Sequence, residues 1–220
     1  MTGNVYRRLF PLLLWVVCIF FFSCGDKCSV EKNTAGSEKV VEQKQTRQVA
    51  FIRIYCYGNI SDDKPYMLAS ELKKYYPWVD LVSRHLDLPK KYYHKGRNRY
   101  DGSGLLKDLG RLRKGDVVLG VTDEVIYKAN EISPTYGIFG VSPVGAHVAL
   151  ISLTLPSGRK HTDDHLVKLA LHELGHAFGL NHCTNEHCFM VDAEHGNKFS
   201  QTPSFCKDCK QFLNRNGWKL

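Results

Sequence analysis

Short runs of hydrophobic residues along the chain predict five β-strands. The runs are rich in β-branched or aromatic residues, and the first of them stops at Gly58-Asn59, a pattern typical of strands. The predicted strands are residues 48–57, 78–82, 116–122, 136–141 and 146–153.

Hydrophobic residues at helical spacing predict helices at residues 65–76, which end at Pro77, at 105–112, from Thr162 or Asp163 to Phe178, and at about 205–213. Strands and helices alternate at first, and strands then follow one another. We therefore expect one α/β or α+β domain with a mixed sheet. At 220 residues and 43% hydrophobic content, the chain can bury a stable core without disulfide bonds.

The helix predicted at residues 162–178 has two distinct faces. His172 and His176 share one of them, and Gly179 follows at a point where a left-handed conformation ends a helix without a Cβ clash. The chain can then reverse and bring His182 back to the same place. The other face is expected to pack on the sheet through Val167, Leu171, Leu174 and Phe178.

The pattern HExxHxxGxxH indicates a catalytic zinc site. Imidazoles four residues apart on a helix point into one space, and His182 supplies a third ligand, which leaves the fourth position of the tetrahedron open for water. Zinc lowers the pKa of such a water to about 7. Glu173, beside His172, is placed to take the proton of the water as general base. His165 on the same face is expected to be a hydrogen-bonded neighbour rather than a ligand.

Four cysteines in two close pairs form a second cluster. Their spacing matches a closed, four-thiolate structural zinc site, so we expect two zinc ions per chain, one catalytic and one structural. Such a site would fix the segment that carries His182 to the C-terminal helix. The cysteines are Cys183, Cys188, Cys206 and Cys209.

The compound pattern HExxHxxGxxHC, Cys-x4-Cys-x-Met and CxxC resembles the archaemetzincin family of zinc metallopeptidases, and the similarity includes residues 119–127 and 137–140. The resemblance implies a metzincin-like domain with a twisted five-stranded sheet, an active-site helix and an edge strand near residues 137–141 that aligns substrate. It also implies the Met-turn role for Met190. It implies the same roles for the three histidines, the four cysteines and Glu173. The residues after Met190 depart from the family pattern.

Residues 1–23 have the pattern of a lipoprotein signal peptide. Arg7 and Arg8 precede an uncharged run of 14 residues at 9–22, which is short for a membrane span. Ser23-Cys24 then resembles a bacterial lipobox, although Phe21 stands in place of the usual leucine. We expect cleavage before Cys24 and a lipid anchor on Cys24 in the bacterial cell envelope. The alternative is a permanent transmembrane anchor.

The polar segment at residues 24–48 lacks aromatic residues and is predicted to be a flexible tether to a domain at residues 49–220. Export leaves the state of the cysteine cluster open, because oxidising compartments favour disulfides. One hypothesis is that the four cysteines pair as disulfides outside the cell. Another is that Arg7-Arg8-Leu9-Phe10, which loosely resembles a twin-arginine signal, directs export of protein that has already folded around zinc.

The formal charge of +8 becomes +6 without Arg7 and Arg8 and points to no particular partner. The basic, tyrosine-rich segment 89–100 has features that stack on bases, but no nucleic-acid-binding fold accompanies it. We expect a solvated loop there and no nucleic-acid partner. The function expected is that of a monomeric zinc metallopeptidase that hydrolyses peptides or small proteins. The alternative is a catalytically silent, zinc-containing lipoprotein that binds polypeptides, and the presence of Glu173 favours catalysis.

Overall fold

The mixed five-stranded sheet predicted from the sequence is present in the computed structural model of the chain. Its strand order is β2-β1-β5-β9-β8, with all neighbours parallel except β8, which runs antiparallel to β9 and forms an edge. The strands are β1 (Ile52–Tyr57), β2 (Val79–Leu81), β5 (Val117–Thr122), β8 (Gly140–Val141) and β9 (Val148–Ser152).

The structure describes residues 50–131, 133–192 and 201–220. The predicted signal peptide at 1–23, the acylated Cys24 and the tether at 24–48 lie outside these residues. Across the described ranges, no helix has both the length and the hydrophobicity needed to cross a membrane.

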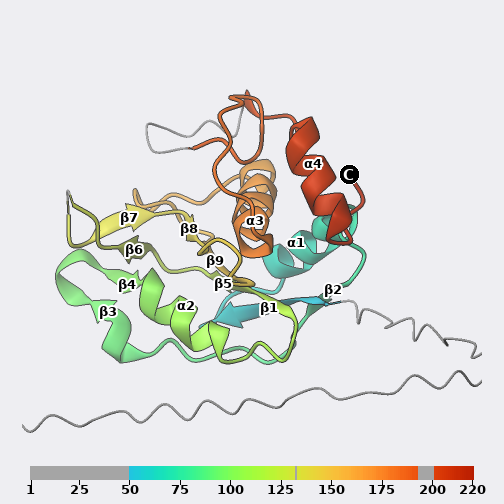
Figure 1. Cartoon of the computed structure of the whole chain (residues 1–220). Coiled ribbons are helices and arrows are strands. Elements are labelled where there is room, and N and C mark those ends of the chain that lie inside the picture. The colour runs from blue at the N-terminus through green and yellow to red at the C-terminus, as the bar shows by residue number, and fades with distance from the viewer. Residues whose placement is uncertain (1–49, 132, 193–200) are drawn as a thin grey trace, which may run out of the picture. The chain divides into compact units, whose positions relative to one another are not determined.

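Helices cover both faces of this sheet (Figure 1). Helices α1 (Asp63–Lys73), α3 (Asp163–Phe178) and α4 (Lys207–Arg215) contribute to the hydrophobic core on one face, and α2 (Gly102–Gly110) contributes to the core on the other. The alternation along β1 decides which side chains face which layer. Ile52 and Ile54 belong to the core under α1 and α3, whereas Tyr57 belongs to the core under α2.

Helix α3 has the predicted bounds, and Thr162 caps its start by accepting a hydrogen bond from a backbone N–H in the first turn. Leu171 and Leu174 are fully buried, as expected, whereas Val167 and Phe178 are only half-buried. The buried face is wider than the predicted stripe because α3 lies between the sheet and the C-terminal segments. It consists of Leu166, Leu169, Ala170, Leu171, Leu174 and Ala177, together with the site residues His172, Glu173, Gly175 and His176.

A second, four-stranded sheet was not predicted. Its order is β3-β4-β6-β7, with strands β3 (Tyr93–His94), β4 (Arg99–Asp101), β6 (Ile126–Lys128) and β7 (Tyr136–Ile138). The prediction that residues 89–100 form a loop was wrong, because this segment contributes β3, most of β4 and two short 3-10 helices, Lys90–Tyr92 and Lys95–Arg97. Strands of two or three residues are too short to show hydrophobic alternation. The strand predicted at 136–141 is divided at Phe139 into β7 and β8, which belong to different sheets.

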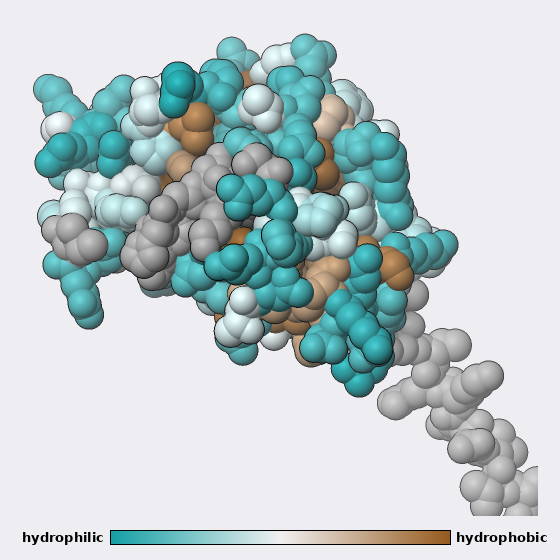
Figure 2. Space-filling view, turned by 90° about the horizontal axis from the view of Figure 1, so that it is seen from above, coloured by the Kyte–Doolittle hydropathy of each residue, from teal (hydrophilic) through white to brown (hydrophobic). Residues whose placement is uncertain are grey.

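Figure 2 shows the protein from above, on the side of α4 in Figure 1. The described residues on this face are mainly hydrophilic, and hydrophobic residues form only small, separate patches. The large hydrophobic side chains lie mainly between the layers, where they position α3 against the sheet.

Candidate metal centre and active site

Three histidines that are separated along the chain come together at the C-terminal end of α3. His172 and His176 lie one turn apart on the helix, which ends at Gly179. Gly179 has a φ of 115°, a left-handed conformation that reverses the chain without a side-chain clash. The reversal brings His182 back to the helix, as the sequence predicted.

The three imidazole rings face one another. The Nε2 atoms of His172 and His176 are 3.1 Å apart, and the ring centroid of His182 lies 5.4 Å from that of His172 and 4.7 Å from that of His176. One nitrogen from each ring lies within 4.8 Å of the others. Ligand nitrogens of a tetrahedral zinc site are about 3.4 Å apart, given Zn–N distances of about 2.0–2.1 Å. The donor set therefore fits a zinc ion.

Two backbone carbonyl groups orient the helical histidines. Nδ1 of His172 donates to the carbonyl oxygen of Phe189 at 2.7 Å, and Nδ1 of His176 donates to that of Leu180 at 2.7 Å. Because a carbonyl can only accept, each ring carries its proton on Nδ1 and presents the Nε2 lone pair to the shared centre. Burial lowers the pKa of His172 to about 4 and also lowers the pKa of His176. Both rings are therefore neutral near pH 7, as metal ligands must be.

The third histidine is oriented by a carboxylate that sequence reasoning did not assign. Nδ1 of His182 lies 3.3 Å from a carboxylate oxygen of Asp192, and both side chains are partly exposed. A carboxylate that holds the second nitrogen of a ligating histidine fixes its ring orientation. Asp192 lies among the residues after Met190 that depart from the family pattern, which was its only signal in the sequence.

Glu173 lies beside the edge of the sheet and is buried, with a relative accessibility of 6%. Burial raises the pKa of its carboxyl group to about 8, and the charge of Lys128 acts in the opposite direction. A Cβ atom on Gly140 would lie 2.7 Å from Oε1 of Glu173. The absence of a side chain at Gly140 therefore allows strand β8 to pass directly over the carboxylate.

The backbone N–H and C=O groups of Gly140 are not bonded to the neighbouring strand β9. Phe139 accepts a hydrogen bond from the N–H of Ser152 at 2.8 Å, and Gly140 is the next residue along, opposite Ile151. Alternate residues of an antiparallel strand direct their N–H and C=O groups to opposite sides. The N–H and C=O of Gly140 thus point to the outer edge of β8, where no other described strand is paired.

Met190 lies beneath the histidine-bearing turn of α3. It is fully buried, and a Cβ atom on Gly175 would lie 2.4 Å from its sulfur. Gly175 lies between His172 and His176 in the sequence, and only glycine there lets the methionine approach the helix so closely. The structure thus places Met190 where the resemblance to archaemetzincins expects the Met-turn methionine.

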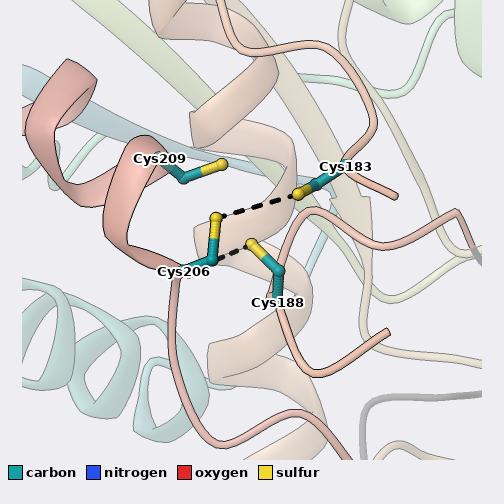
Figure 3. Close-up of side chains that lie close together, drawn as sticks. All are labelled: Cys183, Cys188, Cys206 and Cys209. Atoms are coloured by element: carbon teal, nitrogen blue, oxygen red, sulfur yellow. Dashed lines mark hydrogen bonds between the residues drawn. The ribbon is translucent and has the colours of Figure 1, made fainter. Parts of the chain in front are cut away.

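The four predicted cysteines also converge. Their sulfur atoms lie within 4.8 Å of one another, and Figure 3 shows Cys206 and Cys209 at the start of α4 facing Cys183 and Cys188 from the loop after α3. The Sγ atoms of Cys183 and Cys206 are 3.8 Å apart. A tetrahedron with Zn–S bonds of about 2.3 Å has edges of about 3.8 Å. The thiols of these cysteines are free in the structure.

Backbone N–H groups donate hydrogen bonds to sulfur atoms of this cluster. Sγ of Cys188 accepts from the backbone N–H groups of Met190 at 3.4 Å and Cys206 at 3.2 Å. Although partial burial of the Cys206 thiol opposes ionisation, hydrogen bonds, the largest from the backbone of Cys209, lower its pKa. At Cys206 these bonds favour the thiolate, the form that binds metal, whereas burial raises the pKa of the Cys188 thiol in spite of its hydrogen bonds.

His165 lies outside the histidine cluster, as expected. Its ring packs near that of His161, with centroids 6.4 Å apart, and the three-histidine group of the described residues does not include it. His161 itself is buried against Phe139, and burial lowers its pKa to about 4.

Comparison with known proteins agrees with this geometry. Residues 66–215 match the model of peptidase family M54. The archaemetzincin of Methanopyrus kandleri is 31% identical over 147 residues, which are 66% of this chain and 83% of the relative. Its crystal structure matches with a TM-score of 0.60 at 27% identity, over 77% of this chain and 97% of the other. The crystal structure of archaemetzincin from Archaeoglobus fulgidus, complexed with malonate, matches with a TM-score of 0.58 at 27% identity, over 73% and 99%.

The fold and the histidine centre together define a zinc metallopeptidase, a hydrolase that acts on peptides or proteins. The chain belongs to peptidase family M54, and the archaemetzincins of Methanopyrus kandleri and Methanocaldococcus jannaschii are among its curated relatives.

Proposed function

We propose that His172, His176 and His182 hold the catalytic zinc and that Glu173 is the general base of peptide-bond hydrolysis. The observation that carries the proposal is the convergence of three oriented imidazoles beside a buried carboxylate at an open sheet edge. Three protein ligands leave one position of a tetrahedron for water or substrate.

The zinc site and Glu173 have separate roles in the proposed hydrolysis. Bound zinc supplies Lewis-acid activation of a water molecule and of the substrate carbonyl. Glu173 accepts a proton from the attacking water and passes it to the leaving amine. The C–N bond breaks, the water oxygen remains on the acyl carbon, and the amine leaves with the proton. Burial of Glu173 supports this role because it brings the carboxyl pKa close to neutral pH.

The edge strand β8 is the proposed site of substrate alignment. An extended peptide can add to an exposed sheet edge through main-chain hydrogen bonds. The outward N–H and C=O of Gly140 are available for such bonds, and Glu173 lies directly beneath them. A peptide bound there passes over the carboxylate and the histidines.

We also propose a structural zinc at Cys183, Cys188, Cys206 and Cys209, so that each chain holds two zinc ions. The 3.8 Å separation between two of the sulfurs supports a tetrahedral thiolate site. The site is closed because all four ligands come from the protein, so its role is to join the loop after α3 to the start of α4.

Metal analysis tests both assignments together. The full chain is expected to hold about two zinc ions, and the His176→Ala variant about one, with loss of peptidase activity. His94→Ala, which removes an exposed histidine outside both clusters, should keep both ions and full activity. Unchanged zinc content in His176→Ala would exclude His176 as a ligand.

We propose further that the protein is exported to the bacterial cell envelope and anchored by a lipid on Cys24. The support is the signal-peptide pattern that ends at Ser23-Cys24. Cys24→Ala should release the protein from the membrane fraction of cells, whereas Cys28→Ala should leave it there. Membrane association that survives Cys24→Ala would instead favour the hydrophobic run at residues 9–22 as a permanent anchor.

A further inference from the structure

A basic pocket lies beside the edge strand and outside the zinc centre. It has a volume of about 620 Å³, and three of its lining residues are Arg97, Arg99 and Arg159. None of the described residues that line it is acidic. The three guanidinium groups therefore leave an uncompensated positive charge in a concave part of the surface.

The pocket is built around Arg99, which is half-buried. Its guanidinium donates to the carbonyl oxygens of Thr135 at 3.0 Å and Pro156 at 3.4 Å. A Cβ atom on Gly137 would lie 2.9 Å from Nη1 of Arg99 and 2.7 Å from Cβ of Pro156. The glycine thus makes room for the guanidinium against strand β7, where two neutral carbonyls fix its direction but leave its charge unpaired.

A tight turn carries the second arginine, Arg159. The backbone N–H of Leu155 donates to the carbonyl of Arg159 at 2.7 Å, and the N–H of Gly158 donates to the carbonyl of Leu155 at 2.8 Å. These bonds fix the backbone that carries the exposed Arg159 side chain. Arg97 approaches from the short 3-10 helix before β4.

The pocket lies next to the segment that leads into the edge strand. Gly137 and Phe139 line it. Phe139 packs against the core that includes α3, whereas Ile138 packs against the core that includes α2. Gly137 lies three residues before Gly140, which corresponds to at most about 10 Å along an extended chain. A peptide on the edge of β8 reaches the pocket within about three residues of the bond above Glu173.

We propose that this pocket is a substrate subsite that binds a peptide carboxylate, either an Asp or Glu side chain or the terminal carboxylate. Arginine is suited to this task because its planar fork donates two parallel hydrogen bonds to a carboxylate. The inference rests on the proposed function for its alignment of peptide along β8. A phosphate backbone is the competing ligand, but a half-buried arginine next to a peptide-binding edge favours a single carboxylate over an extended polyanion.

The test uses the zinc-loaded full chain and matched peptides that carry Glu or Gln at each position within four residues of the cleaved bond. A second pair has a free or an amidated C-terminus, which separates the two sources of carboxylate. We expect kcat/KM to favour the carboxylate about tenfold at one position, a difference of about 1.4 kcal/mol. The double variant Arg97→Ala/Arg159→Ala removes two of the three guanidinium groups and should reduce this ratio, with the neutral peptide of each pair as the internal reference. Arg99→Lys should reduce the ratio partially, since it keeps the charge and loses the fork.

Arg84→Ala is the matched control, because Arg84 is exposed and does not line the pocket. A ratio of one in the unmodified protein, or a preference that the double variant keeps, overturns the proposal. Fluorescence anisotropy measures peptide binding to the zinc-loaded Glu173→Gln variant. It gives the ratio of affinities for the Glu and Gln peptides without catalysis. If no peptide is cleaved, the proposed function fails while anisotropy still decides on the subsite. Salt-dependent oligonucleotide binding that the double variant loses, with no change in peptide binding, would assign the pocket to phosphate instead.

Discussion

Replacing Glu173 by glutamine is expected to reduce peptide hydrolysis by about 10²- to 10⁴-fold, the range that general acid–base catalysis contributes. Glutamine keeps the shape of the side chain but cannot accept the proton of the attacking water. Because glutamine has nearly the size of glutamate and strand β8 passes close over this side chain at Gly140, we expect the amide to occupy the place of the carboxylate. The histidines and their orienting carbonyls are unchanged, so the zinc content should equal that of the unmodified protein. The measurement is kcat/KM on a cleaved peptide together with metal analysis.

Glu71→Gln is the control for loss of a carboxylate. Glu71 lies on α1, where it pairs with Lys74 at 2.7 Å, and its substitution should leave hydrolysis unchanged. If Glu173→Gln retains full activity with both zinc ions present, another group is the base. If metal-replete unmodified protein cleaves no member of a diverse peptide library, the alternative of a zinc-containing polypeptide-binding protein replaces the peptidase proposal.

The convergence of the three histidines could be predicted from the sequence because it depends on local structure. His172 and His176 are fixed relative to each other by helical periodicity, and Gly179 determines where the helix ends. His182 follows within a few residues and has little freedom to lie elsewhere. The longer strands of the main sheet could also be predicted from the sequence, because β1, β5 and β9 are five or six residues long and largely buried.

The groups that orient the site could not be read in this way. The carbonyls of Phe189 and Leu180 are backbone atoms, and any residue type supplies them. The contact of Gly140 with Glu173 joins positions that are distant in sequence, and no periodicity records it. The basic pocket requires the second sheet, which brings Arg99 of β4 to Gly137 of β7 through β6. Strands of three residues leave too little pattern for that sheet to be predicted.

Hydrogen bonds join the cysteine cluster to the histidine centre through the loop at residues 183–191. The backbone N–H of Cys206 donates to Sγ of Cys188 at 3.2 Å, and the N–H of Phe189 donates to the carbonyl of Ser204 at 3.0 Å. The carbonyl of Phe189 in turn holds Nδ1 of His172 at 2.7 Å. The segment before α4 thus fixes the loop that orients a proposed catalytic ligand.

Cys206→Ser is therefore expected to remove the structural zinc and also to weaken binding of the catalytic zinc by about 10- to 100-fold, the effect typical of losing a group that orients a metal ligand. Removal of the thiolate frees Cys183, which directly follows His182, and loosens the loop that presents the carbonyl of Phe189 to His172. Two histidines thus lose their support from one distant substitution. Zinc content and competition with a chelator measure the two affinities separately, and Cys56→Ala, in strand β1, controls for loss of a thiol as such. A catalytic zinc that remains as tightly bound in Cys206→Ser as in the unmodified protein would show that the histidine centre forms independently of the cysteine cluster.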